Sequence, residues 1–374
     1  MDKTADTTDW GSQPDRNNRT TVRRRARRRR SALRWTPVVA LSALALAPGA
    51  TAAASHSSSD KHVVPLVFYS SIGFDQLAAT DFTKRFHIPV EVEHNPTGAA
   101  LDQIEASRND PKWDFWWTDG PTNFALLDSQ HMLVRGFEPK VDWNDLGREA
   151  VPRDGSYVPT GITIAAALVY NRQRVAHPPT SWAQLLSPAW KDKVGMNDPS
   201  ISGPTYPFVA GMMQQLGGIS AGESYFEALK ANGLLVEPKN GPTLAALASG
   251  EIDVALVQST AAVGATFSDH ELGVEYLSPS TLLPSAIGID AKAPALARSE
   301  AETFIEYMLS PAGQKIMETG DPTGDSLYYP VLRGIRARPV LPPLTSVETI
   351  TINPYTWGAR EGAIDTWFTQ HIVQ

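Results

Sequence analysis

The chain has 374 residues, of which 42% are hydrophobic and 20% charged, with 33 Lys and Arg against 40 Asp and Glu. This composition is typical of a soluble globular protein with about two domains, and it argues against a disordered or multi-span membrane chain. The absence of cysteine excludes disulfides, thiolate metal sites, iron–sulfur clusters, cysteine nucleophiles and a lipid tether through cysteine.

The net charge of -7 combines two unlike segments. The first 35 residues carry 11 Lys and Arg and four Asp, with seven arginines between positions 23 and 30, whereas the remainder holds 22 basic and 36 acidic residues. An apolar run, Pro37–Ala47, follows the arginines, and small residues come next. Basic, apolar and small residues in this order predict a secretory signal peptide that is cleaved near Ala52 or Ala54.

Two other interpretations fit part of this segment. An arginine run is also typical of a nucleic-acid-binding tail, and an apolar run can be an uncleaved anchor. The apolar run is short for a membrane span, and the acidic remainder disfavours nucleic acid as a partner. We therefore expect residues 1–52 to be a leader and the mature protein to be a soluble monomer in the periplasm. The sequence leaves the export route open.

Beyond the leader, segments typical of strands alternate with segments typical of helices. The first expected strands are Val63–Tyr69, Pro89–Glu93 and Trp113–Trp117, and the first expected helices are Asp75–Phe86, one that begins at Thr97 and Phe124–Met132. Such alternation predicts a parallel sheet with both faces covered.

The same alternation returns later in the chain. The expected strands there are Val194–Asn197, Leu234–Pro238, Ile252–Val257 and Val274–Leu277, and the expected helices are Pro207–Gln215, Glu223–Asn232 and Leu244–Ala248. This weak repetition is either a general property of α/β units or the sign of two lobes that face a shared cleft. Open α/β sheets bind ligands at such a cleft.

Two β-prone segments, Pro159–Tyr170 and Leu282–Ile289, are candidates for strands that cross between the lobes. Two crossings divide lobe 1 into residues 63–160 and 282–374, with lobe 2 formed by residues 161–281. In the second part of lobe 1 we expect helices at Ser299–Leu309, where Ser299 would be the cap, and at Pro311–Thr319. The tail from residue 341 to residue 374 is expected to pack on lobe 1.

No catalytic motif stands out. The sequence has no Gly-x-Ser-x-Gly elbow, no His-Glu-x-x-His motif and no phosphate-binding Gly-x-x-x-x-Gly-Lys-Ser/Thr loop, and its eight histidines are scattered. We therefore predict a protein that is not an enzyme, with no catalytic residues, no resident metal and no cofactor.

Short polar residues instead gather where the expected strands end and helices begin. They are Ser70, Ser71, Gly73, Thr97, Gly98, Thr118, Asp119, Ser200, Ser202, Gly203, Thr205, Ser259 and Thr260. Each hydroxyl is either an ordinary helix cap or part of a set of helix N-termini that converge on an anion.

Several motifs of the chain resemble one known family. They are Phe68-Tyr69-Ser70-Ser71, the stretch 109–114 (NDPKWD), the stretch 117–120 (WTDG), the stretch 309–315 (LSPAGQK) and Tyr329-Pro330-Val331. Across residues 63–335 the chain resembles a family 1 extracellular solute-binding protein, the substrate-capturing subunit of an ABC importer. The resemblance is to the group that includes iron(III) and 2-aminoethylphosphonate binders.

The resemblance implies a two-lobe, type 2 periplasmic binding fold that closes on a small solute and docks on an inner-membrane permease. The iron binders of the group carry an adjacent tyrosine pair where this chain has Ser259-Thr260, and the Tyr328-Tyr329 pair belongs to a different motif. We therefore expect a small anionic or zwitterionic solute, similar to an aminophosphonate or organophosphate, rather than ferric iron. Ferric iron, a sensor that signals to a partner, and an enzyme on the same scaffold remain the alternatives.

The expected ligand-binding residues are hydroxyl and backbone donors for the anion, together with Asp119 for an ammonium group and an aromatic wall at Trp117 or Tyr329. The full set is Ser70, Ser71, Gly73, Thr97, Gly98, Trp117, Asp119, Ser202, Thr205, Ser259 and Tyr329. Strand alternation sends Trp116 and Trp117 to opposite faces, so at most one of them can reach the cleft.

Overall fold

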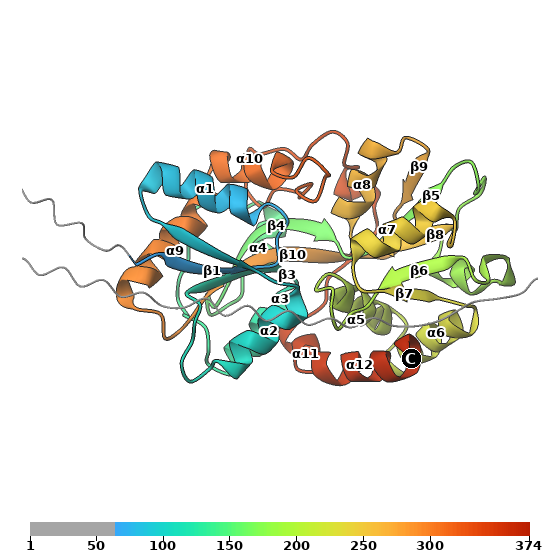
Figure 1. Cartoon of the computed structure of the whole chain (residues 1–374), viewed down its shortest axis with the longest axis horizontal. Coiled ribbons are helices and arrows are strands. Elements are labelled where there is room, and N and C mark those ends of the chain that lie inside the picture. The colour runs from blue at the N-terminus through green and yellow to red at the C-terminus, as the bar shows by residue number, and fades with distance from the viewer. Residues whose placement is uncertain (1–63) are drawn as a thin grey trace, which may run out of the picture. The chain divides into compact units, whose positions relative to one another are not determined.

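The computed structural model describes residues 64–374, which lie in one compact unit (Figure 1). The predicted leader, its cleavage site and the polar segment 55–61 fall outside the described residues. Within residues 64–374, no helix is long and apolar enough to cross a bilayer.

Two separate sheets organise this unit. One has six strands in the order β11-β10-β3-β1-β2, with β4 paired to β10, and the other has five in the order β7-β6-β8-β5-β9. We call the part built on the first sheet lobe 1 and the part built on the second lobe 2. The strands of lobe 1 are β1 (Leu66–Ser70), β2 (Val90–His94), β3 (Phe115–Asp119), β4 (Val158–Ile164), β10 (Ser280–Ile289) and β11 (Thr349–Ile350). Those of lobe 2 are β5 (Ala167–Asn171), β6 (Val194–Asn197), β7 (Leu235–Glu237), β8 (Val254–Val257) and β9 (Leu272–Glu275).

Helices cover both faces of each sheet. On lobe 1 they are α1 (Asp75–Phe86), α2 (Thr97–Ala106), α3 (Pro121–Ser129), α4 (Asp145–Ala150), α9 (Ala295–Met308) and α10 (Pro311–Thr319). On lobe 2 they are α5 (Thr205–Gln215), α6 (Ile219–Ala231), α7 (Asn240–Ser249) and α8 (Ser259–Ser268). The chain ends in α11 (Pro354–Gly358), α12 (Glu361–Phe368) and a π-helical turn, Thr369–Val373.

Strand alternation divides the core of lobe 1 into two layers. Phe115 and Trp117 of β3 join the core cluster that contains Phe82 of α1 and Phe304 of α9. Trp116, between them, joins the cluster of α2 and α3 on the other face. Both tryptophans are fully buried, so a central strand covered on both faces leaves neither ring at the surface.

The predicted parallel pairings are present, but both sheets are mixed. The pairs β1–β2, β1–β3, β6–β7 and β6–β8 are parallel. The pairs β10–β3, β10–β4, β5–β8 and β5–β9 are antiparallel. The expected crossing segment 159–170 is in fact two strands, since β4 ends at Ile164 in lobe 1 and β5 begins at Ala167 in lobe 2.

Some helices and strands begin and end where the local sequence predicts. The structure confirms α1, α10 and β6 at their predicted limits. Helix α9 begins at Ala295, four residues before the predicted cap, because Pro294 takes the extended backbone of an N-cap and good helix formers follow it. The prediction that Ser299 caps this helix is therefore wrong.

The predicted packing of the tail was also wrong for its last part. Trp357, Ile364, Phe368 and Ile372 join the hydrophobic core of lobe 2. Helix α11 also lies along α3 of lobe 1, where Gly358 allows close approach to the Thr122 carbonyl. The tail therefore contacts both lobes.

Two acidic side chains of α12, which belongs to this tail, have buried carboxyl oxygens. Oε2 of Glu361 and Oδ1 of Asp365 are buried, and neither has a hydrogen-bond partner among the described residues. Burial raises the pKa of both carboxyls, that of Asp365 to about 7, and the nearby Asp198 carboxylate adds to the effect on Asp365. The protonated form of Asp365 is consequently favoured in the folded state.

A raised folded-state pKa contributes stability that is present at low pH and is lost as the pH rises through about 7. We expect Asp365→Asn to raise the free energy of unfolding by about 2–4 kcal/mol at pH 8, given about 1.4 kcal/mol per pKa unit, and to change it little at pH 4. Urea unfolding at both pH values measures this difference, with the exposed Asp102→Asn as the control. Equal effects of Asp365→Asn at the two pH values would contradict the assignment.

Candidate functional site

A polar pocket of about 250 Å³ lies between the lobes, where several strands end and helices begin. Lobe 1 contributes the segments that lead into α1 and α2, and lobe 2 contributes those that lead into α5, α7 and α8. The first backbone N–H groups of a helix have no partner within the helix, and the helix dipole places partial positive charge there. The pocket is therefore surrounded by helix N-termini from both lobes.

Five of the predicted ligand-binding residues line this pocket: Ser71, Gly73, Thr97, Asp119 and Ser202. Oγ of Ser71 is buried and has no hydrogen-bond partner among the described residues. The Thr97 hydroxyl lies 2.9 Å from that of Thr118. Ser202 belongs to a hydrogen-bonded group of polar side chains, in which Nδ2 of Asn197 donates to Oγ of Ser202 at 3.4 Å and to Oδ1 of Asn240 at 2.6 Å.

The other six predicted residues do not line the pocket, and five of them make a hydrogen bond within the protein instead. Oγ of Ser70 accepts from the Ile72 N–H, and Oγ of Ser259 accepts from the Ile164 N–H, both at 3.0 Å. Nε1 of the buried Trp117 donates to Ser285, and the Tyr329 hydroxyl donates to the Pro342 carbonyl at 2.8 Å. The remaining two are Thr205, whose N–H donates to the Ser202 carbonyl at the start of α5, and Gly98.

Gly98 lies at the point where the lobes touch. A Cβ on Gly98 would come within 2.4 Å of the Ser200 carbonyl oxygen of lobe 2, and one on Gly203 would come within 2.3 Å of the Thr97 hydroxyl of lobe 1. These distances are below van der Waals contact, so only glycine at these two positions allows the lobes to approach this closely. The structure therefore shows a closed arrangement at this contact.

The Asp119 carboxylate joins both lobes beneath the pocket. The Tyr328 hydroxyl donates to it at 2.8 Å, and Nε2 of Gln258, at the end of β8 in lobe 2, donates at 2.7 Å. Burial raises the pKa of Asp119 even though these donors favour its ionised form. Asp325 lies close by, where Gly73 leaves room for it and the Thr260 hydroxyl donates to it at 3.0 Å. Burial, reinforced by Asp119, raises the pKa of Asp325 to about 7.

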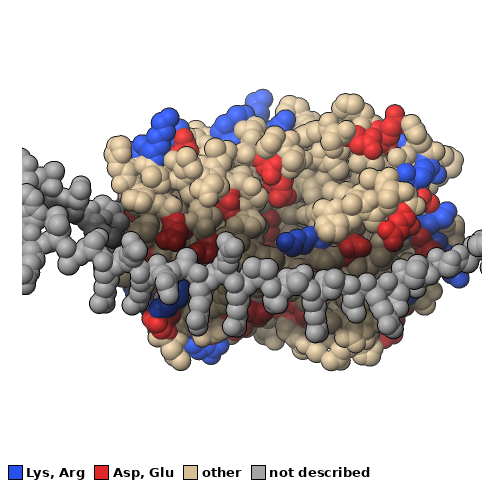
Figure 2. Space-filling model, viewed as in Figure 1, with Lys and Arg blue, Asp and Glu red and all other residues tan. Residues whose placement is uncertain are grey.

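Two basic residues line the same pocket. Nδ1 of His94 lies 2.6 Å from the Asp75 carboxylate, and this hydrogen bond raises the pKa of His94. Lys239 precedes α7 and makes no ion pair among the described residues. On the face shown in Figure 2, acidic and basic side chains are interspersed without one continuous patch of either sign. Local groups rather than a broad surface field therefore determine what the pocket attracts.

Sequence reasoning missed further polar residues of the pocket, among them His94, Lys239, Asn240, Gln258, Asp325 and Tyr328. His94 is the last residue of β2, and the pair Lys239-Asn240 comes shortly after β7, so the strand-end argument extended to those two strands would have found them. Asp325 and Tyr328 lie in an irregular segment after α10, and no local pattern indicates that this segment returns to the cleft.

No three His, Asp or Glu side chains within residues 64–374 are grouped so as to hold a metal ion. The hydroxyl of Tyr328 binds Asp119, whereas that of Tyr329 binds Pro342. The adjacent tyrosines therefore have separate structural partners.

A family model described as bacterial extracellular solute-binding protein matches residues 74–319. The chain belongs to this family. Its members bind small solutes and work with membrane permeases; family and fold are those of binding proteins and not of enzymes.

Solved structures show the same two-lobe fold. The periplasmic binding protein AfuA from Actinobacillus pleuropneumoniae, with fructose-6-phosphate bound, is 20% identical, with a TM-score of 0.73 over 83% of this chain and 98% of that one. Iron-bound HitA from Pseudomonas aeruginosa is also 20% identical, with a TM-score of 0.68 over 81% of this chain and 98% of that one. The predicted fold, a type 2 periplasmic binding protein, is thus confirmed.

One curated relative matches a smaller part of the chain than these structures do. The chain is 25% identical over 245 residues to the phosphoglycerate transport regulatory protein PgtC of Salmonella typhimurium, a match that covers 63% of this chain. The chain spans 58% of the length of that relative.

The contact at Gly98 yields a prediction about closure. Gly98→Ala is expected to weaken solute binding about tenfold or more, because the added methyl group meets the Ser200 carbonyl only when the lobes are closed. The folding of lobe 1 should not suffer, since alanine is the better helix former.

The absence of cysteine allows two introduced cysteines, Asp102→Cys on α2 and Ser220→Cys on α6, to carry spin labels alone. Pulsed electron spin resonance should show a solute-dependent shorter distance in the parent protein and its loss in Gly98→Ala. Gly362→Ala, whose added methyl group meets open space, is the matched control. If Gly98→Ala shows the same solute-dependent population of short label distances as the parent protein, the contact at Gly98 does not limit closure of the lobes.

Proposed function

We propose that this protein captures a small organic phosphate or phosphonate, anionic or zwitterionic, in the pocket between its lobes. The observation that carries the proposal is the convergence of helix N-termini from both lobes on a small pocket that also holds the buried, unpartnered hydroxyl of Ser71. Phosphate oxygens accept several hydrogen bonds at once, and helix N-termini supply both N–H donors and favourable dipoles.

The charged residues of the pocket favour a ligand that carries an ammonium or hydroxyl group in addition to its anionic group. Lys239 and His94 are suited to an anion, whereas Asp119 and Asp325 are suited to an ammonium or hydroxyl group. Asp325 can donate a hydrogen bond when protonated and can pair with an ammonium group when ionised, since its pKa is about 7. An aminophosphonate or a hydroxylated phosphate ester would use both sets.

The comparisons support phosphorylated solutes on this scaffold. One structure of the same fold carries fructose-6-phosphate, and the curated relative is named for phosphoglycerate transport regulation. A fold shared at 20% identity does not transfer a ligand by itself, so the proposal depends on the residues of this pocket. Ferric iron is the competing ligand, because HitA of the same fold is iron-bound.

We further propose that the two lobes, each built on its own sheet, rotate about the crossing strands β4 and β10. In this proposal the exported, monomeric protein delivers its solute to a permease in the inner membrane. A sensor role is the second candidate, because the curated relative is named a regulatory protein. An uptake assay separates the two roles: the protein is added to liposomes that contain a permease and its ATPase encoded by neighbouring genes, and ATP-driven uptake of the solute is measured. A sensor would not support uptake.

A thermal-shift screen of the mature domain tests the ligand class. Phosphate esters, aminophosphonates, inorganic phosphate, polyamines and ferric citrate are the compounds to compare. A ligand at about 100 times its Kd stabilises by about 2.7 kcal/mol, which raises Tm by about 5 °C in a domain of this size.

We expect this rise with an organic phosphate or phosphonate. Ser71→Ala should weaken binding about tenfold, since an anion loses a buried donor, while the exposed Ser220→Ala should not. A shift with ferric ion alone, abolished by Tyr328→Phe or Tyr329→Phe, would overturn the anion proposal.

The titration of Asp325 predicts that the affinity for the solute depends on pH. Whether the affinity falls or rises with pH distinguishes the two types of ligand. A phosphate monoester is a dianion from pH 7 to pH 8.5, so ionisation of Asp325 over this range should weaken its binding several-fold. A ligand with an ammonium group beside Asp325 should bind more tightly over the same range. Asp325→Asn should remove either slope in isothermal titration calorimetry. A slope that persists in Asp325→Asn would show that another group controls binding.

A further inference from the structure

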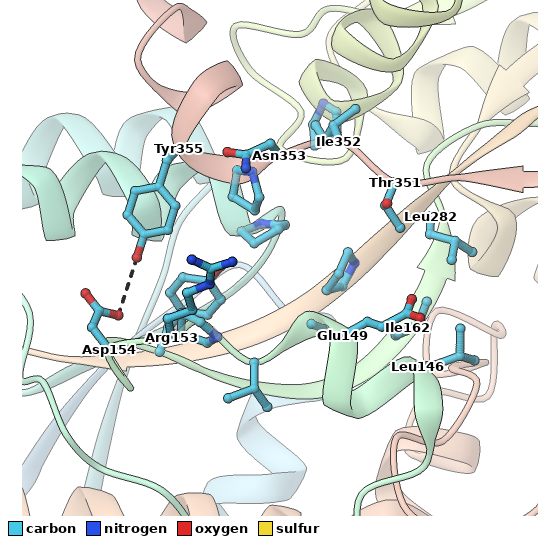
Figure 3. A pocket seen from close by; sticks show the side chains of 18 of the residues that line it. Leu146, Glu149, Arg153, Asp154, Ile162, Leu282, Thr351, Ile352, Asn353 and Tyr355 are labelled. Atoms are coloured by element: carbon cyan, nitrogen blue, oxygen red, sulfur yellow. Dashed lines mark hydrogen bonds between the residues drawn. The ribbon is translucent and has the colours of Figure 1, made fainter.

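A second cavity, of about 870 Å³, lies against β4 and β10, the strands that connect the lobes (Figure 3). Its walls include Leu146 near the start of lobe 1 helix α4, Gln214 of lobe 2 helix α5, and the tail segment from Thr351 to Tyr355. Its volume lies within the range of small-molecule sites in proteins. The cavity shares no lining residue with the pocket between the lobes.

Strand alternation places the two cavities on opposite faces of the same strands. On β4, Ile162 lines the second cavity, whereas the hydroxyl of the next residue, Thr163, accepts from Gln258 of the pocket. On β10, Pro284 lines the second cavity, whereas the adjacent Ser285 bonds to Trp117 beside Asp119. Neighbouring residues of a strand point to opposite faces, so β4 and β10 form the wall between the two cavities.

The tail spans this cavity and is attached to both lobes. The Tyr355 hydroxyl lies 3.2 Å from Oδ2 of Asp128 in lobe 1. Nε2 of Gln214 in lobe 2 donates to the Thr351 carbonyl at 2.9 Å, and Nε1 of Trp357 donates to Oε1 of Gln214 at 3.0 Å. The walls of the cavity therefore come from both lobes, and their spacing depends on how the lobes are arranged.

The chemistry of the walls indicates the class of ligand. Leu146, Ile162 and Leu282 supply an apolar surface on one side of the cavity, and Ile352 adds to it from the tail. Arg153 lies on the other side in this view, below Asn353 of the tail (Figure 3). Among the described residues Arg153 makes neither an ion pair nor a side-chain hydrogen bond. The neighbouring Asp154 is already engaged, since Arg135 lies 3.5 Å from its carboxylate and Tyr355 contacts it. Glu149 also lines the cavity, from α4.

We propose that this cavity binds a small amphipathic carboxylate or sulfonate, whose anionic group pairs with Arg153 and whose apolar part packs on Leu146, Ile162 and Leu282. Its occupation stabilises the arrangement of the lobes in which the polar pocket between them is closed. This second statement rests on the proposed function, because it needs a solute in the polar pocket. The binding statement stands without it.

Fluorescence titration with anilinonaphthalene sulfonate, an apolar aromatic sulfonate, tests the binding statement on the whole mature domain. We expect one site per chain, with affinity reduced at least tenfold by Arg153→Met. Arg148→Met is the matched control, because Arg148 lies five residues before Arg153, on α4, and pairs with Glu138 outside the cavity. Glu149→Gln should leave the affinity unchanged or increase it, since it removes a negative charge from the walls. Circular dichroism and Tm verify that each variant is folded.

Equal effects of Arg153→Met and Arg148→Met, or no effect of either, would overturn the assignment of the site to Arg153. Filling the cavity provides a second test, in which Ala150→Leu should weaken probe binding even if Arg153→Met fails to fold. Undiminished binding to Ala150→Leu would place the probe elsewhere.

Linkage between the two cavities is the test of coupling. If the probe favours the closed arrangement, it should tighten binding of the phosphorylated solute at least threefold, and the solute should tighten probe binding by the same factor. Independent affinities would overturn the coupling but not the site. Failure to find a phosphorylated solute would reject the proposed function, and the probe titration alone would still decide the second site.

Discussion

The antiparallel pairing of β4 with β10 is the interaction on which the rest of this structure depends. Their register runs from Leu282 opposite Ile164 to Ile287 opposite Val158, with an irregularity between Ser285 and Ala286. The strands come from segments more than a hundred residues apart, and together they carry the chain between its two sheets. One face of the pair supports the polar pocket and the other supports the apolar cavity, so a single element shapes both.

Asp119 is a carboxyl group that this arrangement buries beside the pocket, although burial costs it hydration. A fully buried carboxyl group is stable only if donors compensate for lost hydration. Here Tyr328 and Gln258 supply those donors from segments that reach the site from different parts of the chain. Because Gln258 belongs to lobe 2 and Asp119 to lobe 1, the hydrogen bond from Gln258 also holds the lobes together. Local chemistry and domain arrangement are therefore linked at one residue.

The fold could be predicted from sequence where a segment determines its own structure. Periodicity and termination signals were sufficient for α1, β6 and α10, and family motifs were sufficient for the two-lobe architecture. The site could be predicted only in part. Strand-end reasoning reached Ser71, Thr97 and Asp119, but Asp325 and Tyr328 enter the cleft through tertiary packing of an irregular segment. Trp117 was placed in the cleft as a candidate wall, yet alternation on a strand covered on both faces sends its ring into the core.

The contacts at Gly98 and Gly203 bear on how this family of clefts can change its ligand. The lobes touch at two glycines, since the Gly98 backbone meets the Ser200 carbonyl and Gly203 meets the Thr97 side chain. Thr97 also lines the pocket, so the approach of the lobes depends on this side chain as well as on the main chain. Substitutions at lining positions outside these two contacts, such as Ser71 or Lys239, can then alter the chemistry that is recognised without altering how closely the lobes approach. A permease that recognises only the closed shape would accept the protein whichever solute it holds.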